Sequence, residues 1–344
     1  MSAAKSGAGG LLGRRAAAAS EPHAAQAARD VIERGSAVDA VVAGVLAAAA
    51  ESPTVFFGPV QILVAGGGAG LVAIDGRIRQ PGRGVQRPRG FLAGEAVPGA
   101  ARVGVSALPA ALTAVIASFG SMAMLRVAGP ALAIASARSP ERAALLETFA
   151  RRGAQAVLEG DIATELLAAA GRAARGLLTT DDLATIRPDV VRFEERRLGT
   201  SGILTAPWAA SAGVDASSTH VVAAGDARGM LAIACYEVPA DGVAVAALGM
   251  ALPAFAHPVM RGQTRVTPGA VLAAPAPIAL RARRGVVDLA IGVASARDAE
   301  DIVRATVASL DETTALAQAL AALPAGRPIA IAKGDDVARV LASA

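Results

Sequence analysis

Residues 61–70 read QILVAGGGAG, and two interpretations of this stretch lead to different folds. Apolar residues that run into glycines are typical of the phosphate loop of a dinucleotide-binding fold, which would indicate a flavin or nicotinamide protein. That loop needs a helix directly after its glycines, because the helix N-terminus holds the pyrophosphate. Here the chain continues LVAIDGRIRQPGR, in which strand-forming residues precede the turn dipeptide Asp75-Gly76 and then Pro81. The stretch therefore predicts a β-hairpin closed by a glycine turn.

The composition excludes several classes of protein. Of the 344 residues 53% are apolar and 18% are charged, which predicts a globular chain with a buried core. No window approaches eighteen large apolar residues, and the first arginines follow the short Leu11-Leu12 pair, which is the wrong order for a secretory signal. We therefore expect a cytoplasmic protein without a membrane segment. The net charge is only +4, and with 3% aromatic residues the chain lacks the stacking side chains that a single-strand nucleic-acid binder uses.

The residues that hold metals and form disulfides are scarce. Cys235 is the one cysteine, so an internal disulfide and a cysteine metal cluster are excluded. A histidine site would need all of His23, His220 and His257, or help from carboxylates. We expect neither a metal nor another cofactor, and the sequence does not indicate an oligomeric state.

The apolar pattern predicts an α+β fold in the order helices, strands, helix. Residues 22–34 have helical spacing, and Gly35 is expected to form a left-handed C-terminal cap. Ser36 and Asp39 form a capping box ahead of a helix that is apolar on nearly all sides, and that helix should be buried. Residues 106–175 are again helical, and Thr179 with Asp182 predicts another capped helix. Strands are expected at 191–199, 202–208, 219–226, 229–238 and 286–295, and the tail from about 297 should be helical.

The stretch most suited to chemistry is DASSTH, from Asp215 to His220, at the start of a buried strand. A serine or threonine hydroxyl is a weak nucleophile unless a base stands beside it. Chain cleavage before the hydroxyl residue supplies such a base, because the new α-amine has a pKa of about 7.7–8.0. The alternative interpretation is a hydroxyl-rich turn that leads into a strand, with His220 packed against a neighbour.

Six segments in order resemble the gamma-glutamyltranspeptidase family of N-terminal-nucleophile hydrolases, over roughly residues 15–310. RGSAVDAVVAG at 34–44 is similar to a helix of that family, and LVAIDGRIRQP at 71–81 to its strand with the substrate-binding arginine, here Arg77. LLTTDDLATIRP at 177–188 and TAPWAASAG at 205–213 are similar to two further motifs. SSTH falls on the family's T-T-H, which places the nucleophile at Ser218, followed by Thr219 and His220. LAIGVASARDAEDI at 289–302 resembles the segment that forms the oxyanion hole.

The chain also departs from the family's pattern. The two serines that hold the substrate carboxylate fall on Ala273 and Ala274, and the acidic residue for the amino group falls near Ala254. A third polar position falls near Pro239, so Arg77 is the one remaining residue of the γ-glutamyl clamp. The segment before the nucleophile is cut to a few residues between Gly213 and Ser218.

The resemblance implies a four-layer αββα sandwich of the N-terminal-nucleophile type. It implies a single domain of residues 1–344, with a large-subunit-like part at 1–217 and a small-subunit-like part at 218–344. The implied function is an amide-bond hydrolase or acyltransferase that cleaves itself before Ser218. The backbone N–H groups of Ser295 and Ala296, at the family's glycine pair, would hold the oxyanion.

Two further expectations follow, with their alternatives. The substrate should be a small molecule other than an ordinary γ-glutamyl compound, and an acidic one if Arg77 faces the site. If Arg77 is instead a solvated hairpin charge, it carries no information on the ligand. The alternative function is a non-catalytic pseudoenzyme that keeps the fold as a binding or assembly module, which the alanines at the clamp positions favour.

Overall fold

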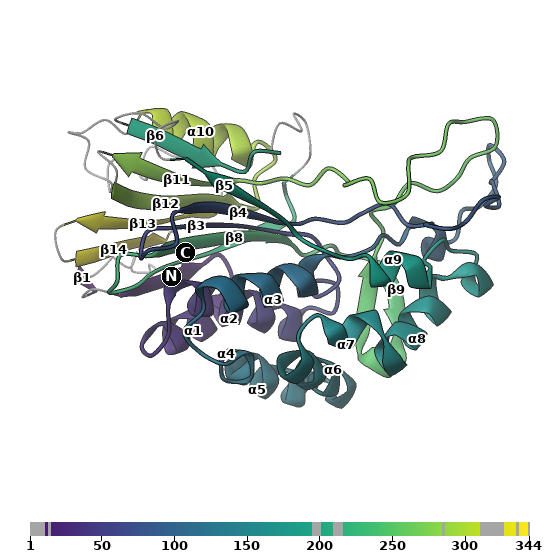
Figure 1. Ribbon diagram of the computed structural model, residues 1–344, viewed down its shortest axis with the longest axis horizontal. Coiled ribbons are helices and arrows are strands. Elements are labelled where there is room, and N and C mark those ends of the chain that lie inside the picture. The colour runs from purple at the N-terminus through teal and green to yellow at the C-terminus, as the bar shows by residue number, and fades with distance from the viewer. Residues whose placement is uncertain are drawn as a thin grey trace, which may run out of the picture.

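The computed structural model describes residues 11–12, 15–194, 201–208, 216–283, 286–309, 327–334 and 337–342. Within these ranges the chain is a mixed α+β structure with two six-stranded sheets that lie face to face (Figure 1). Helices cover the outer face of one sheet, and of the described helices α10 lies against the outer face of the other. The expected α+β class is confirmed.

The first sheet mixes strands from before and after Ser218. In spatial order its strands are β2 (Ala16–Ala19), β7 (Thr219–Gly225), β8 (Leu231–Glu237), β3 (Val60–Ala65), β4 (Leu71–Gly76) and β5 (Asp189–Phe193). All neighbours in it are antiparallel. A cut before Ser218 would therefore leave both pieces held in one sheet by hydrogen-bond ladders.

The second sheet closes the apolar layer between the sheets. Its strands in spatial order are β1 (Leu11–Leu12), β14 (Val337–Ala342), β13 (Arg327–Gly334), β12 (Val286–Ala294), β11 (Ile278–Arg283) and β6 (Ser201–Thr205). Alternate residues of both sheets meet in one buried cluster, which includes Leu63, Leu71, Val221, Ile233, Ile278, Leu280, Ala290 and Ile331. The intervening residues of the first sheet, such as Ile62, Ile74 and Val222, face the helices instead.

The helical layer on the first sheet is built around one buried helix. This is α2 (Ala37–Glu51), which packs on β7, β8 and on α1 (Pro22–Ile32). Around them lie α3 (Leu108–Phe119), α4 (Met124–Val127), α5 (Gly129–Arg138), α6 (Pro140–Arg152), α7 (Gln155–Leu158), α8 (Gly160–Ala170) and α9 (Thr180–Ala184). A small hairpin of β9 (Gly242–Val245) and β10 (Met250–Pro253) adjoins α8, and α10 spans Ala299–Ser309. Among the described helices none is long and apolar enough to cross a membrane.

The start of α2 confirms one predicted cap and corrects another. Ser36 and Asp39 form the expected capping box, and Asp39 also accepts hydrogen bonds from Ser121, whose N–H lies 2.9 Å from its Oδ2. The expected left-handed cap at Gly35 is wrong, because α1 is capped by Glu33 in a right-handed conformation and Gly35 does not have a positive φ. A Cβ at Gly35 would lie 2.9 Å from the sulfur of Met122, so close packing explains this glycine.

The opening stretch is the predicted hairpin, in which β3 pairs antiparallel with β4 across a turn of left-handed glycines from Gly66 to Gly70. The turn expected at Asp75-Gly76 is wrong, since both residues belong to β4. A Cβ at Gly76 would lie 2.5 Å from Val60 Cγ1, so this glycine too allows a close approach.

The strand predictions hold at β6, β7, β8 and β12. The strand expected at 191–199 is confirmed only to Phe193 in β5, and residues 195–199 lie outside the described ranges. The tail contains the expected helix α10, but an entirely helical tail is wrong because β13 and β14 complete the second sheet.

Candidate active site

Two hydroxyl residues at the head of β7 meet one buried carboxylate on β8. Thr219 lies directly opposite Glu237 in the antiparallel ladder. The Ser218 hydroxyl donates to Glu237 Oε2 at 2.5 Å, and the Thr219 hydroxyl donates to Oε1. Glu237 is 4% exposed and Thr219 is fully buried. A carboxylate at this distance can hold or accept the proton of the serine hydroxyl.

Sequence reasoning missed Glu237, although a signal for it exists. The strands 219–225 and 231–237 form a hairpin around Asp226 and Gly229, and pairing counted outward from that turn ends with Glu237 beside Thr219. Alternation then places both side chains on the face that looks toward the second sheet, with Val221 and Cys235.

His220 lies on the opposite face of the first sheet. Its Nδ1 lies 3.1 Å from the Ser20 hydroxyl, and its ring stacks on Tyr236, with 6.0 Å between the ring centroids. Burial first, and then the nearby Glu21, raises the pKa of Tyr236 well above its ordinary value, so Tyr236 stays a neutral donor to that carboxylate. These contacts give His220 a packing role and do not bring it to the hydroxyls of Ser218 and Thr219.

The turn after β12 reaches the same point from the second sheet. Ser295 has a left-handed backbone, with φ at 56°, which is a conformation that glycine adopts far more easily than other residues. Its N–H donates to the carbonyl of Thr219 at 2.9 Å. That N–H, predicted for the oxyanion, is therefore engaged with the chain itself, and the N–H of Ala296 stays a prediction.

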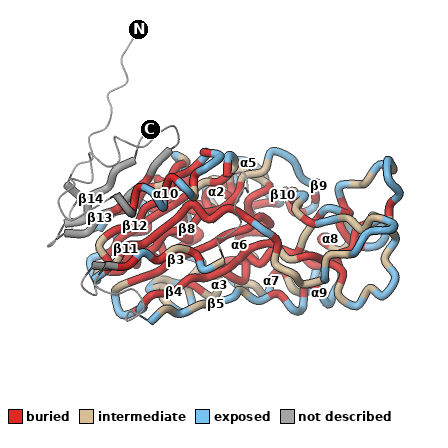
Figure 2. The backbone as a smooth tube through the Cα atoms, turned by 90° about the horizontal axis from the view of Figure 1, so that it is seen from above, coloured by how far each residue is buried: buried red, intermediate tan, exposed pale blue. Residues whose placement is uncertain are grey.

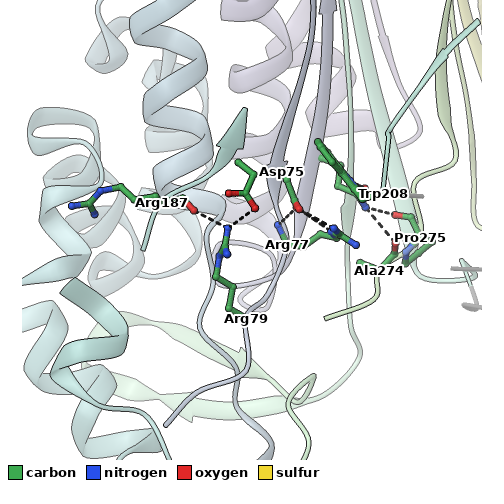
Figure 3. Close-up of polar contacts among 9 residues, drawn as sticks. Asp75, Arg77, Arg79, Arg187, Trp208, Ala274 and Pro275 are labelled. Carbon is green, nitrogen blue, oxygen red and sulfur yellow. Dashed lines mark hydrogen bonds and ion pairs between the residues drawn. The ribbon is translucent and has the colours of Figure 1, made fainter. Parts of the chain in front are cut away.

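Arg77 is buried and paired. It is 9% exposed, so the interpretation as a solvated hairpin charge is wrong. Its Nε lies 3.0 Å from Asp75 Oδ1 and its Nη2 lies 2.9 Å from Oδ2, while the guanidinium stands over the ring of Trp208, 5.5 Å from the centroid (Figure 3). Asp75 takes two of the five guanidinium donors, and three remain for solvent or a ligand.

Gln61 connects Arg77 to the segment of the missing serines. The indole N–H of Trp208 donates to Gln61 Oε1 at 2.5 Å, and the side-chain Nε2 of Gln61 donates to the backbone carbonyl of Pro275 at 2.7 Å. Ala274 is buried in this contact and Ala273 is exposed. The structure thus places Arg77 and the predicted clamp alanines around one polar cluster.

The clamp position near Ala254 lies elsewhere. Ala254 is exposed directly after β10, and the N–H of Ala256, two residues further on, donates to the carbonyl of Arg102 at 2.7 Å. Pro239 follows Glu237 by two residues, and its carbonyl accepts from Thr54 at 2.8 Å.

The hydroxyls and Arg77 occupy the same end of the first sheet. Strands β8 and β3 separate β7 from β4, so three strand spacings put the two about 14 Å apart. Because the Arg77 side chain is long, the distance between its guanidinium and the hydroxyls, which a ligand would span, can be shorter than this strand separation. Among the described residues, no group of three or more His, Cys, Asp or Glu side chains is placed to hold a metal ion.

Known structures share this fold. The structure of cephalosporin acylase from Bacillus halodurans matches 100% of this chain and 96% of its own, with a TM-score of 0.76 and 14% identity. Two structures of LmbA2991 each match 97% of this chain, with TM-scores of 0.72 and 0.64 and identities of 13% and 14%. No family model matches the chain, and no curated protein is similar to it in sequence. At the level of the fold, the full-length match to the acylase confirms the resemblance predicted from the sequence.

The buried Arg77–Asp75 pair gives a first prediction. Arg77→Ala should lower the free energy of unfolding by about 3–5 kcal/mol, because it leaves the buried Asp75 carboxylate unpaired. The double variant with Asp75→Ala should recover part of that loss in a urea-denaturation cycle. The more exposed Arg79–Asp189 pair is the control and should show a coupling below about 1 kcal/mol. Equal coupling in both pairs would contradict the burial argument.

Ser295 gives a second prediction. Ser295→Gly should leave stability unchanged or raise it, whereas Ser295→Val should lower it by about 1–2 kcal/mol, since a β-branched residue tolerates the left-handed backbone poorly. The Ser295 side chain is exposed, so lost packing does not confuse the comparison. The urea midpoints of the two variants measure these changes in stability. If the glycine variant were as unstable as the valine variant, the left-handed backbone at Ser295 would not be strained.

Proposed function

We propose that the chain is a gamma-glutamyltranspeptidase-like amide-bond hydrolase or acyltransferase in which Ser218 becomes an N-terminal nucleophile. The helix, sheet, sheet, helix order supports the αββα sandwich of that class. The observation that carries the proposal is the bond from the Ser218 hydroxyl to Glu237 at the point where the Ser295 turn meets Thr219. It supplies a nucleophile and a proton acceptor at one end of the two sheets.

In the uncut chain Glu237 is the base for self-cleavage. The α-amine of Ser218 does not yet exist as a base, because its nitrogen is part of a peptide bond. Glu237 takes the hydroxyl proton while Ser218 Oγ attacks the carbonyl carbon of Ser217. The Ser217–Ser218 C–N bond then breaks, the proton passes to the leaving nitrogen, and water hydrolyses the resulting ester. Thr219 holds the other oxygen of Glu237 and so fixes the carboxylate.

After cleavage the new α-amine of Ser218 is the base for the external reaction. Ser218 attacks the carbonyl of an amide, and the acyl group passes to water or to an amine. The N–H of Ala296 is the candidate oxyanion donor, and that of Ser295 joins it only if its bond to Thr219 opens. Arg77, with its three remaining donors, is the candidate contact for an acidic group of a small-molecule substrate.

A non-catalytic binding module is the second candidate. Arg77 is already paired with Asp75, the N–H of Ser295 is engaged, and alanines replace the clamp serines at Ala273 and Ala274. In this case the chain stays uncut, and the same end of the sandwich binds a ligand without chemistry.

Maturation separates the two candidates. The purified protein should give two fragments by denaturing mass spectrometry, residues 1–217 and 218–344, which stay together in native conditions because both sheets contain strands of each. Ser218→Ala should abolish cleavage, and Glu237→Gln should slow it at least about 100-fold through loss of the base.

Glu300→Gln is the matched control for Glu237. The Glu300 carboxylate is half-buried, accepts from the N–H of Ala276 and lies near Cys235, as Glu237 does, and its replacement should not affect cleavage. A wild-type chain that stays intact, with the same activity as Ser218→Ala, would leave only the binding module.

The substrate gives a separate prediction. With alanine at Ala254, Ala273 and Ala274, a γ-glutamyl group would bury charges without partners, at a cost of several kcal/mol. Glutathione and γ-glutamyl anilides should therefore show little or no turnover in a colorimetric or amino-acid assay of the mature protein. Robust turnover of either compound would show that the assignment of these three positions is wrong.

A further inference from the structure

A large cavity lies away from Ser218, in the lobe at the far end of the molecule. Two segments leave the sandwich and run side by side to this lobe, and they are joined by backbone bonds between Gln80 and Ala270 and between Phe91 and Val259 (Figure 1). One segment continues through residues 84–91 and forms one wall of the cavity, and residues 172–179 form the opposite wall. The cavity holds about 900 Å³, which is the size of a small-molecule site.

Four arginines line this cavity, two from each wall: Arg87 and Arg89, and Arg172 and Arg175. None of its described lining residues is acidic. A guanidinium stays charged at any working pH and binds phosphate or carboxylate oxygens in a bidentate way. Arg87 and Arg172 are exposed, and their side chains form no hydrogen bond or ion pair with any described residue.

The other two arginines are held in place. Arg89 and Arg175 both contact Glu95 Oε1, at 2.7 and 3.0 Å, and both stand over the ring of Phe91, at 5.6 and 5.3 Å from its centroid. The N–H of Leu92 and the two guanidiniums hold the pKa of Glu95 below its ordinary value, so the carboxylate stays charged. One carboxylate and one ring thus fix two cations that come from opposite walls.

The nearby acidic groups do not cancel this charge. Asp181 lies beside Gly84 at the rim, and the buried Asp182 accepts from the backbone N–H groups of Gly82 and Arg83 beneath the loop. Arg265 adds another cation next to the loop, bonded to the Gly82 carbonyl. Positive charge therefore stays in excess around the cavity. Much of the chain in this lobe is exposed, as the pale-blue loops of Figure 2 show.

We propose that this cavity binds a small organic polyanion, a molecule with two or more phosphate or carboxylate groups. Arg87 and Arg172 contact its charges from opposite walls, and the Arg89–Glu95–Arg175 group adds two guanidiniums that are held in fixed positions. Two separated pairs of guanidiniums select a ligand with at least two anionic groups over a single anion. The site is independent of Ser218 and of the proposed chemistry.

Isothermal titration with inorganic tripolyphosphate, and separately with citrate, tests the site on the full-length protein. Arg87→Ala combined with Arg172→Ala should weaken saturable binding at least tenfold, and inorganic phosphate should bind far more weakly than either probe. Arg34→Ala combined with Arg126→Ala is the matched control, because both are exposed arginines of the helical layer and the loss of charge is equal. This control should change affinity less than twofold.

Preference for tripolyphosphate or for citrate distinguishes a phosphorylated ligand from a polycarboxylate, and saturable binding of either supports the site. Unchanged melting temperatures show that the cavity variant remains folded, since its two side chains are exposed. The proposal is overturned if neither probe binds saturably, or if the control pair weakens binding as much as the cavity pair.

Discussion

The pairing register of β7 on β8 is the constraint on which the candidate site depends. It sets Thr219 opposite Glu237, and in the same ladder it sets Val221 opposite Cys235 and Ala223 opposite Ile233, all facing the second sheet. A shift by one residue would turn every one of these side chains to the helical face. The apolar core therefore holds the register, and the register delivers a carboxylate to two hydroxyls. The apolar contacts in the middle of β7 and β8 thus determine which polar side chains meet at the ends of these strands.

The space between the sheets changes character along its length. Most of it is apolar, but at the end near Ser218 it contains Glu237, Gln61 and the Arg77–Asp75 pair, all buried. Buried polar groups cost free energy unless they are hydrogen-bonded, and each of these is bonded at short range. Ser295 adds a left-handed backbone at the same place. Burial of polar groups and local strain together are typical of a functional site.

Local signals in the sequence were sufficient for much of the fold and for part of the site. Both capping boxes, the glycine hairpin and the position of Ser218 at the head of a strand depend on neighbouring residues, and they were predictable. Trp208 comes to the site through packing at long range, which no local pattern encodes. Glu237 was missed although the register of the β7–β8 hairpin, counted outward from its turn, places it beside Thr219. Gly35 and Gly76 were misassigned because a glycine that permits a close approach looks the same in sequence as one that permits a turn. Strands β13 and β14 were missed because an alanine-rich tail has helical propensity, whereas pairing with β12 decides its structure.

The pairing of Arg77 changes what this end of the site can recognise. A free guanidinium attracts an acidic group through its net charge, but the Arg77–Asp75 pair is neutral, and its carboxylate would repel a second one nearby. Asp75 and the ring of Trp208 also fix the orientation of the guanidinium, so its remaining donors are presented with little loss of conformational entropy. Recognition at Arg77 would therefore depend on hydrogen-bond geometry more than on charge. An acidic group of the substrate would bind here only where its oxygens match the directions of the remaining donors, so the orientation of that group determines the affinity more than its charge does.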